Sequence, residues 1–195
     1  RILAIAYPFV CNNYLFPIWN YQKKLQVMDK HKIIILSLFF VSVCNIGIAQ
    51  SVEKVKVLNS IEITANADKV WTAISNLCNL DKLVPEIIEQ TEMVGNGEGS
   101  IVTLTLKSNG AKVVEKITNL DNKKRVLSYE MIETPMPLSY YKATISMVTL
   151  DYDKYNISFD SVFKATEGNN EMMTNTIDNF QKTFLTNVKK IYNEK

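Results

Sequence analysis

The chain has 195 residues, and its shares of hydrophobic (47%) and charged (22%) residues are ordinary for a folded globular protein. The formal net charge is only +2, and acidic residues slightly outnumber basic ones in residues 50–195. No basic stripe interleaved with aromatic residues occurs there, so we expect no nucleic acid as a partner. The sequence carries no indication of the oligomeric state.

The histidine content excludes several kinds of active site. The chain has one histidine, His31, and residues 50–195 have none. Nucleophilic schemes that need a histidine, a histidine general base and a histidine-ligated zinc ion are therefore excluded from that part. We expect neither a metal site nor a cofactor, and any catalysis would have to rest on carboxylates, Tyr, Lys or the one remaining thiol.

Residues 28–49 have the pattern of a secretory signal peptide. Met28–Lys32 form a short basic start, Ile33–Ile48 form an apolar run, and Gly47–Ala49 supply the small residues of a cleavage site. We expect cleavage near Ala49, which would place the mature protein in the periplasm or outside the cell, without stable membrane insertion.

Two alternatives to this interpretation stay open. The first is a membrane anchor, although the run of about 16 residues is shorter than the ~20 that a bilayer span needs. The second is lipidation of Cys44, which the large Val43 before it disfavours. Residues 1–27 precede Met28, and we interpret them as upstream sequence from a mis-set start, or else as a further membrane segment.

The mature part, residues 50–195, is predicted to begin with a strand and two short helices. Apolar and polar residues alternate over most of Val52–Ile63, which predicts a strand. A helix then starts at Asn66 or Asp68 and carries Val70, Trp71, Ile74, Leu77 and Cys78 at helical spacing. A second short helix over Leu80–Val84 ends at Pro85, because proline in a helix interior removes a hydrogen bond and clashes with the preceding turn.

From residue 87 the apolar residues repeat every second position. This period predicts six strands separated only by short turns, which is typical of an antiparallel meander. The predicted strands are Ile87–Val94, Ser100–Lys107, Lys112–Leu120, Val126–Glu133, Tyr140–Leu150 and Tyr155–Lys164.

One long amphipathic helix is predicted for Glu171–Tyr192. Its apolar stripe consists of Met173, Ile177, Phe180, Phe184, Val188 and Ile191, spaced three or four residues apart. A sheet and a helix with such a stripe must bury their apolar faces against each other. Because a curved sheet cannot touch a straight helix everywhere, we expect an internal apolar cavity between them, and such cavities usually hold ligands.

In the order and spacing of its segments, the region from about residue 58 to 192 resembles the START-related, or SRPBCC, helix-grip superfamily. It is most similar to the subgroup of polyketide cyclase/dehydrase and lipid-transport-like proteins. The resemblance rests on Ala67–Ile74, Gly97–Ser100, Val114–Ile117 with Leu120–Asp121, Leu127–Glu130, Pro137–Thr144 and Ile157–Phe163. It implies an α+β helix-grip fold, in which a seven-stranded curved antiparallel sheet wraps around the long C-terminal helix.

The resemblance also implies where a ligand would bind. By similarity to ligand-binding members, the inward-facing sheet positions would be Leu104, Leu106, Glu115, Tyr129, Met131, Leu138, Tyr141, Ala143 and Phe159. Helices of this kind also form part of the cavity wall, which would add Ile177, Phe180 and Phe184. The loop that gates the hormone-receptor members is reduced to Ser108–Gly110, which disfavours a hormone-receptor switch.

Glu115 is the candidate site residue with the widest range of possible chemical roles. Its strand places it on the presumed inner face with Val113 and Ile117, where a carboxylate is costly unless it is paired or hydrogen-bonded. Its pKa could then rise enough for acid–base work. The alternatives are an anchor for a ligand or for water, and a structural group satisfied by Tyr129 or Tyr141.

Three functions remain open. The first is an exported, non-enzymatic binder of a small hydrophobic or amphipathic ligand such as a lipid, an isoprenoid or an aromatic polyketide. The second is a cyclase or dehydratase without a metal, in which Glu115 is the general acid or base. The third is a structural or partner-binding domain whose cavity is filled by its own large side chains.

Overall fold

The computed structural model describes residues 53–193. The predicted upstream segment 1–27, the predicted signal peptide 28–49 and its cleavage site near Ala49 lie outside the described residues. Within the described part, strand β1 (Val55–Thr64) leads into two short helices and a 3-10 turn, followed by six strands and the long helix α5 (Asn170–Tyr192).

The first helix, α3 (Ala67–Ile74), begins where the sequence offers a capping residue. The side chain of Asn66 accepts a hydrogen bond from the backbone N–H of Lys69 at 3.0 Å, which satisfies one of the free donors of the first turn. The 3-10 turn η1 (Leu77–Asn79) and the helix α4 (Leu80–Leu83) follow, and the chain leaves this helix just before Pro85. Trp71 is buried in the core, and its Nε1–H donates to Asn122 Oδ1.

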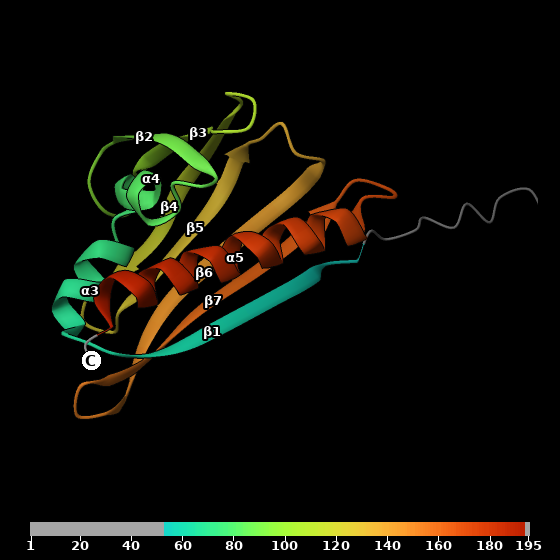
Figure 1. Ribbon diagram of the computed structural model, residues 1–195. Helices are drawn as coiled ribbons and strands as arrows, with labels where there is room; N and C mark the ends of the chain where they lie inside the picture. The colour runs from blue at the N-terminus through green and yellow to red at the C-terminus, as the bar shows by residue number, and fades with distance from the viewer. Residues whose placement is uncertain (1–52, 194–195) are drawn as a thin grey trace, which may run out of the picture. The chain divides into compact units, whose positions relative to one another are not determined.

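The remaining strands form the predicted meander with small changes of their ends. They are β2 (Ile88–Val94), β3 (Ile101–Leu106), β4 (Lys112–Asp121), β5 (Val126–Glu133), β6 (Leu138–Asp151) and β7 (Lys154–Ala165). The sheet has seven strands in the order β1-β7-β6-β5-β4-β3-β2, and every neighbouring pair is antiparallel. The first strand thus returns to pair with the last, as Figure 1 shows.

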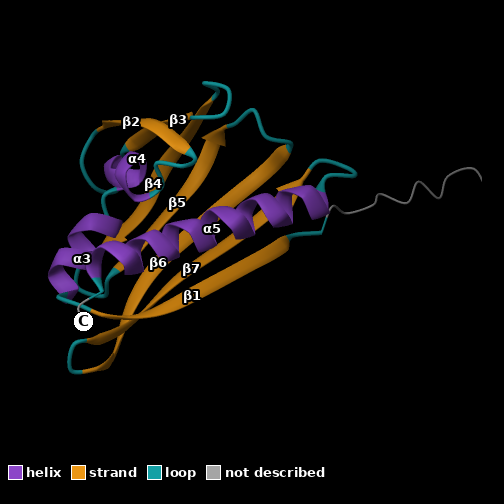
Figure 2. Cartoon of the chain, in the orientation of Figure 1, coloured by secondary structure: helices purple, strands orange, loops and turns teal. Residues whose placement is uncertain are grey.

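The sheet curves around helix α5, which runs across its inner face (Figure 2). The register of β4 against β5 shifts twice, between Val114 and Glu115 and between Ile117 and Asn119. Such irregularities bend a strand and increase its local twist, and the pairings of β2 with β3 and of β6 with β7 contain them as well. The predicted helix-grip architecture is therefore confirmed.

The helix stripe that packs on the sheet differs from the predicted one at three positions, Gln181, Leu185 and Ile191. Met173, Ile177, Phe184 and Val188 are buried as expected, but Ile191 is 53% exposed. Gln181, which the apolar pattern left out, is fully buried, as is Leu185 next to the stripe. Ile191 lies five full turns after Met173 and so on the same side of the helix, but it stands in the last turn of α5, where the helix ends.

Candidate functional site

One row of side chains crosses five strands on the inner face of the sheet. The register pairs Ile117 with Tyr129, Tyr129 with Ala143, Ala143 with Ser161, and Ser161 with Val57. Paired residues share a face of the sheet, so these five side chains all point toward α5. Ala143, the smallest of them, lies between Tyr129 and Ser161 in this row.

An aromatic cluster fills the part of the interior under the middle of α5. The ring of Phe159 packs edge-on against those of Phe184 and Phe180, with centroids 5.4 and 6.1 Å apart. Phe159 and Phe184 have no accessible surface. Because even a water molecule finds no room beside these two rings, the chain's own side chains occupy this part of the interior.

One end of the inner face carries apolar residues that are only partly buried. Leu106 ends β3, Met131 lies near the end of β5, and Leu138 begins β6. Because neighbouring strands are antiparallel, the three residues lie at the same end of the strands. All three are partly exposed, and so is Phe180 on the helix, whose ring also borders the aromatic cluster through Phe159; all four pack against the core. We call these four residues the rim.

Glu115 on β4 lies opposite the rim residue Met131 on β5 in the sheet register, and it is 4% exposed. Its Oε2 atom is buried and has no hydrogen-bond partner. Burial disfavours the ionised form, which raises the pKa of Glu115 to about 8. The carboxyl group is therefore mostly protonated at neutral pH, and it can donate one hydrogen bond and accept others.

Two buried tyrosines are the electrostatic neighbours of this carboxyl group. The rings of Tyr129 and Tyr141 have centroids 6.3 Å apart. Burial raises the pKa of Tyr141 above its usual range, and the nearby Glu115 raises it further. The pKa of Tyr129 rises by burial and through Tyr141 and Glu115. Both hydroxyl groups thus stay protonated and can only act as neutral donors and acceptors.

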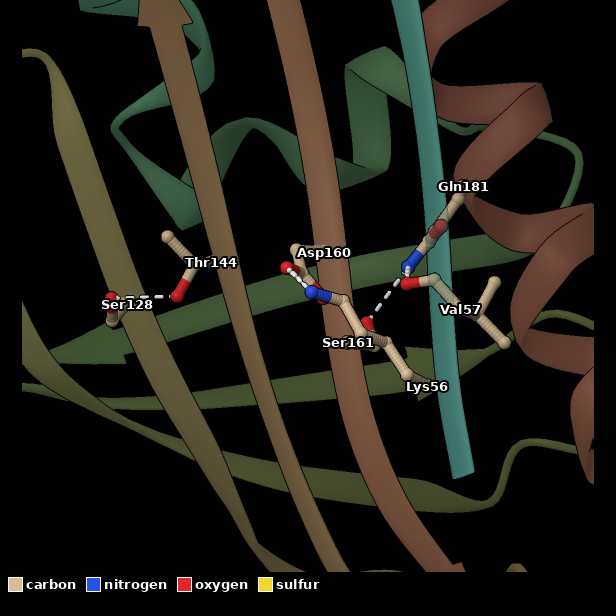
Figure 3. A network of polar contacts seen from close by, with 7 residues as sticks. All are labelled: Lys56, Val57, Ser128, Thr144, Asp160, Ser161 and Gln181. Atoms are coloured by element: carbon tan, nitrogen blue, oxygen red, sulfur yellow. Dashed lines mark hydrogen bonds and ion pairs between the residues drawn. The ribbon is translucent and has the colours of Figure 1, made fainter. Parts of the chain in front are cut away.

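A line of polar side chains leads from Tyr141 to the outside of α5. The hydroxyl oxygens of Tyr141 and Ser161 are 3.0 Å apart, and Gln181 Nε2 donates to Ser161 Oγ at 2.8 Å. Figure 3 shows Gln181 reaching from the helix past Val57 on β1 to Ser161 on β7. Asn59 Nδ2 continues the line by donating to Gln181 Oε1 and to Asp178 Oδ1, both at 2.9 Å.

The other polar contacts in Figure 3 belong to the outer face of the sheet. There Ser128 and Thr144 share a hydrogen bond of 2.9 Å, and Lys56 pairs with Asp160 at 2.7 Å. Asp160 and Ser161 are adjacent in sequence but point to opposite faces. The inner polar line is therefore separate from these surface contacts.

All twelve residues predicted for the site lie in or against the single core between the sheet and α5. Leu104, Glu115, Tyr129, Tyr141, Ala143, Phe159, Ile177 and Phe184 are buried, and Leu106, Met131, Leu138 and Phe180 form the rim. That they contact a ligand stays a prediction. Ser161, Gln181 and Asn59 were not predicted from the sequence, although a glutamine four residues after Ile177 and three before Phe184 indicates a buried polar contact.

Other features of the described residues lie apart from this site. An open surface depression lined by Asp68, Lys69, Thr72, Ala73 and Tyr192 contains none of the predicted site residues. Within residues 53–193 no group of three or more His, Cys, Asp or Glu side chains is placed to hold a metal ion. In the same range, the helices are too short or too polar to cross a membrane.

Solved structures with the same fold include proteins of several kinds. The protein XoxI from Bacillus cereus has a TM-score of 0.64 at 19% identity, over 70% of this chain and 94% of its own. The Zhui aromatase/cyclase from Streptomyces sp. R1128 has a TM-score of 0.63 at 20% identity, over 71% and 93%. Norcoclaurine synthase from Thalictrum flavum, in complex with dopamine and hydroxybenzaldehyde, has a TM-score of 0.62 at 24% identity, over 73% and 88%.

At these identities the solved structures establish the fold alone. No curated protein sequence matches the chain significantly. The family model described as polyketide cyclase / dehydrase and lipid transport matches residues 54–192, which is most of the chain and nearly all of its described part. The chain therefore belongs to the polyketide cyclase / dehydrase and lipid transport family.

Proposed function

We propose that this protein binds a small hydrophobic or amphipathic molecule between the inner face of the sheet and α5. The observation that carries the proposal is the buried Oε2 atom of Glu115, which has no hydrogen-bond partner although the buried polar groups Ser161 and Gln181 do. A buried polar atom without a hydrogen bond costs about 1–3 kcal/mol. A ligand with one polar group would remove that cost, and such orphaned groups in native proteins call for an explanation of this kind.

The ligand's apolar part is expected to enter at the rim. Leu106, Met131, Leu138 and Phe180 expose apolar surface there, and covering it contributes roughly 25 cal/mol per Å². The closed packing of Phe159 and Phe184 keeps the ligand out of the aromatic cluster unless these rings move. The ligand we propose is therefore small, or is held with one end outside the rim.

The class of ligand we propose is a lipid, an isoprenoid or an aromatic polyketide. The family description names both polyketides and lipids, which supports this range. The structure of norcoclaurine synthase holds dopamine and hydroxybenzaldehyde, so a neighbour with this fold accommodates small aromatic molecules with polar groups.

A cyclase or dehydratase is the second candidate function, and the state of Glu115 favours it. A pKa of about 8 is near the operating pH, where a carboxyl group can both give and take a proton. The neighbouring Tyr129 and Tyr141 would then hydrogen-bond to a substrate carbonyl. Binding alone needs fewer assumptions, so we place it first.

We also propose that the protein acts outside the cytoplasm, after removal of residues 28–49. The support is the sequence pattern of a basic start, an apolar run and a small-residue end. Mass determination of the mature protein from the cell envelope tests this: an N-terminus at Gln50 is expected, and an intact Met28–Ala49 segment would contradict export with cleavage.

Titration of the full chain with N-phenyl-1-naphthylamine, a fluorescent apolar amine, tests the binding proposal. We expect saturable binding at about one probe per chain, and displacement by oleate or by an aromatic ketone. Glu115→Gln should change the affinity only. If the wild type turns over a polyketide-like substrate and Glu115→Gln abolishes that turnover, the second candidate function replaces the first. An absence of saturable binding contradicts both.

A further inference from the structure

We propose that Gln181 is a positioning residue that fixes the hydroxyl of Tyr141 as a donor toward the interior. The site would then select ligands that present an uncharged acceptor oxygen, above all a carbonyl. This inference rests on the proposed function, because it specifies the polar group of the proposed ligand. It follows from the direction of each hydrogen bond in the line from α5 to Tyr141.

The outer end of the line is fixed by a carboxylate. The hydrogen bonds from Lys182 and Asn59 lower the pKa of Asp178, so this group is ionised and can only accept. The side-chain atom of Asn59 that faces Asp178 must therefore be its NH₂ group. The same NH₂ group also donates to Gln181, so the atom of Gln181 that faces it must be the acceptor Oε1.

The inner end of the Gln181 amide is fixed independently. Its NH₂ group lies 3.4 Å from the backbone carbonyl oxygen of Val57, which can only accept. The same NH₂ group lies 2.8 Å from Ser161 Oγ. Both ends of the amide thus require the same orientation, and Gln181 donates to Ser161.

The hydroxyl of Ser161 can then donate its single proton to only one of its neighbours. Its neighbours in the line are a donor, Gln181 Nε2, and the hydroxyl oxygen of Tyr141 at 3.0 Å. Ser161 has no accessible surface, so water cannot accept the proton. Ser161 therefore donates to Tyr141, and the proton of Tyr141 is left to point away from Ser161, toward Tyr129, with which Tyr141 shares a side-chain hydrogen bond, and toward Glu115.

The alternative direction leaves a buried donor without an acceptor. If Tyr141 donated to Ser161, the Ser161 proton would face Gln181 Nε2, which is itself a donor. An unsatisfied buried donor is costly, so the direction set by Gln181 prevails. Gln181 thereby acts on the ligand through two hydroxyl groups without touching it.

A matched pair of probes tests the consequence. The ketone 2-acetylnaphthalene has an acceptor oxygen, and 2-isopropylnaphthalene has a similar shape without one. Each is titrated against the full chain, and the readout is the ratio of their dissociation constants. Gln181→Met keeps the length of the side chain but cannot donate, so it should reduce the preference for the ketone about tenfold, as expected for the loss of one oriented hydrogen bond.

Asn187→Ala is the matched control. Asn187 also lies on α5, and its side chain donates to the backbone oxygen of Leu83 at 2.9 Å. Its replacement therefore also removes a hydrogen bond between the helix and another part of the chain. It has no contact with the line to Tyr141, and the ratio should stay at the wild-type value. A ratio that is unchanged in Gln181→Met, or that falls equally in both variants, overturns the inference.

A neutron structure of the perdeuterated full chain decides the direction without any ligand. We expect a deuteron on Ser161 Oγ directed at Tyr141 Oη. A deuteron on Tyr141 Oη directed at Ser161 Oγ overturns the inference, even if ligands bind. If neither naphthalene binds to the wild type while the deuterons lie as expected, the proposed function fails and the role of Gln181 in orienting Tyr141 stands.

Discussion

The hydroxyl oxygens of Tyr141 on β6 and Ser161 on β7 lie 3.0 Å apart across a diagonal of the sheet register. Both residues are buried, and Gln181 joins them to the helix. The same contact thus links the packing of α5 on the sheet to the polar end of the candidate site. Glu115 differs from these three residues, because one oxygen of its buried carboxyl group has no hydrogen-bond partner.

Glu115 should make the protein less stable as the pH rises. Its pKa is about 8 in the folded chain, against an ordinary value of 4.5. Between these two values the unfolded chain has lost the proton and the folded chain holds it. The free energy of unfolding therefore falls with rising pH, by at most about 1.4 kcal/mol per pH unit from this group, and levels off above the folded value.

Glu115→Gln removes this titration and should be the more stable protein at pH 7, by ~3 kcal/mol as an upper figure. Urea unfolding from pH 4 to 9 measures it, and the two curves should converge near pH 4. Glu133→Gln, at an exposed position on the neighbouring strand, is the control and should keep the wild-type slope. Parallel curves for Glu115→Gln and the wild type would show that the carboxyl group is not held neutral.

Blocking the rim should abolish ligand binding without unfolding the protein. Met131 is partly exposed on the inner face, so Met131→Trp adds bulk where the ligand is proposed to enter. Ile132, the next residue, points to the outer face and is 48% exposed. We expect Met131→Trp to weaken N-phenyl-1-naphthylamine binding more than tenfold, a loss of at least about 1.4 kcal/mol. Ile132→Trp should leave it within about twofold, and equal affinities would place the binding site elsewhere.

The burial difference along α5 gives a test of the packing. Phe184 is fully buried between the helix and the sheet, whereas Ile191 is 53% exposed. Phe184→Ala is expected to cost about 3–5 kcal/mol of stability, because it leaves a cavity in a closed aromatic cluster. Ile191→Ala should change stability by no more than about 0.5 kcal/mol. Chemical denaturation of both variants measures this, and similar losses would contradict the described face of the helix.

The sequence predicted the fold because each element carries a clear local pattern. The seven strands alternate, the long helix has a stripe, and Pro85 and the glycine-rich turns mark the ends. It also placed Glu115, Tyr129 and Tyr141 on the inner face, since a strand's period of two residues fixes which side chains share a face.

The polar line could not be predicted in the same way. Asn59, Ser161 and Gln181 come from a strand at each end of the described part and from the last helix, and the register that joins them is long-range. A polar residue within an apolar stripe signals a buried contact but does not name its partner. Which side chains close the interior also depends on packing, so no local pattern distinguishes the fully buried Phe159 from the partly exposed rim.

Two glycines in the β2–β3 turn provide a matched test of local geometry. Gly95 and Gly97 both have positive φ angles, +99° and +80°, which strain any L-residue with a side chain. A Cβ atom at Gly95 would also approach Ser100 Oγ to 3.0 Å, whereas one at Gly97 would meet nothing within 4 Å. Gly95→Ala should therefore lose ~1 kcal/mol more stability than Gly97→Ala. Equal losses in thermal unfolding would mean that the contact with Ser100 relaxes freely.

The most direct test of the account is to ask what the protein carries when it is purified. The full chain and the Met131→Trp and Ile132→Trp variants would be isolated under native conditions, extracted with organic solvent and analysed by mass spectrometry. We predict an apolar or amphipathic compound with an acceptor oxygen, near one per chain, in the wild type and in Ile132→Trp, and its loss in Met131→Trp. A wild-type protein that yields no such compound, or a compound that Met131→Trp retains in full, would contradict a ligand site between the sheet and α5.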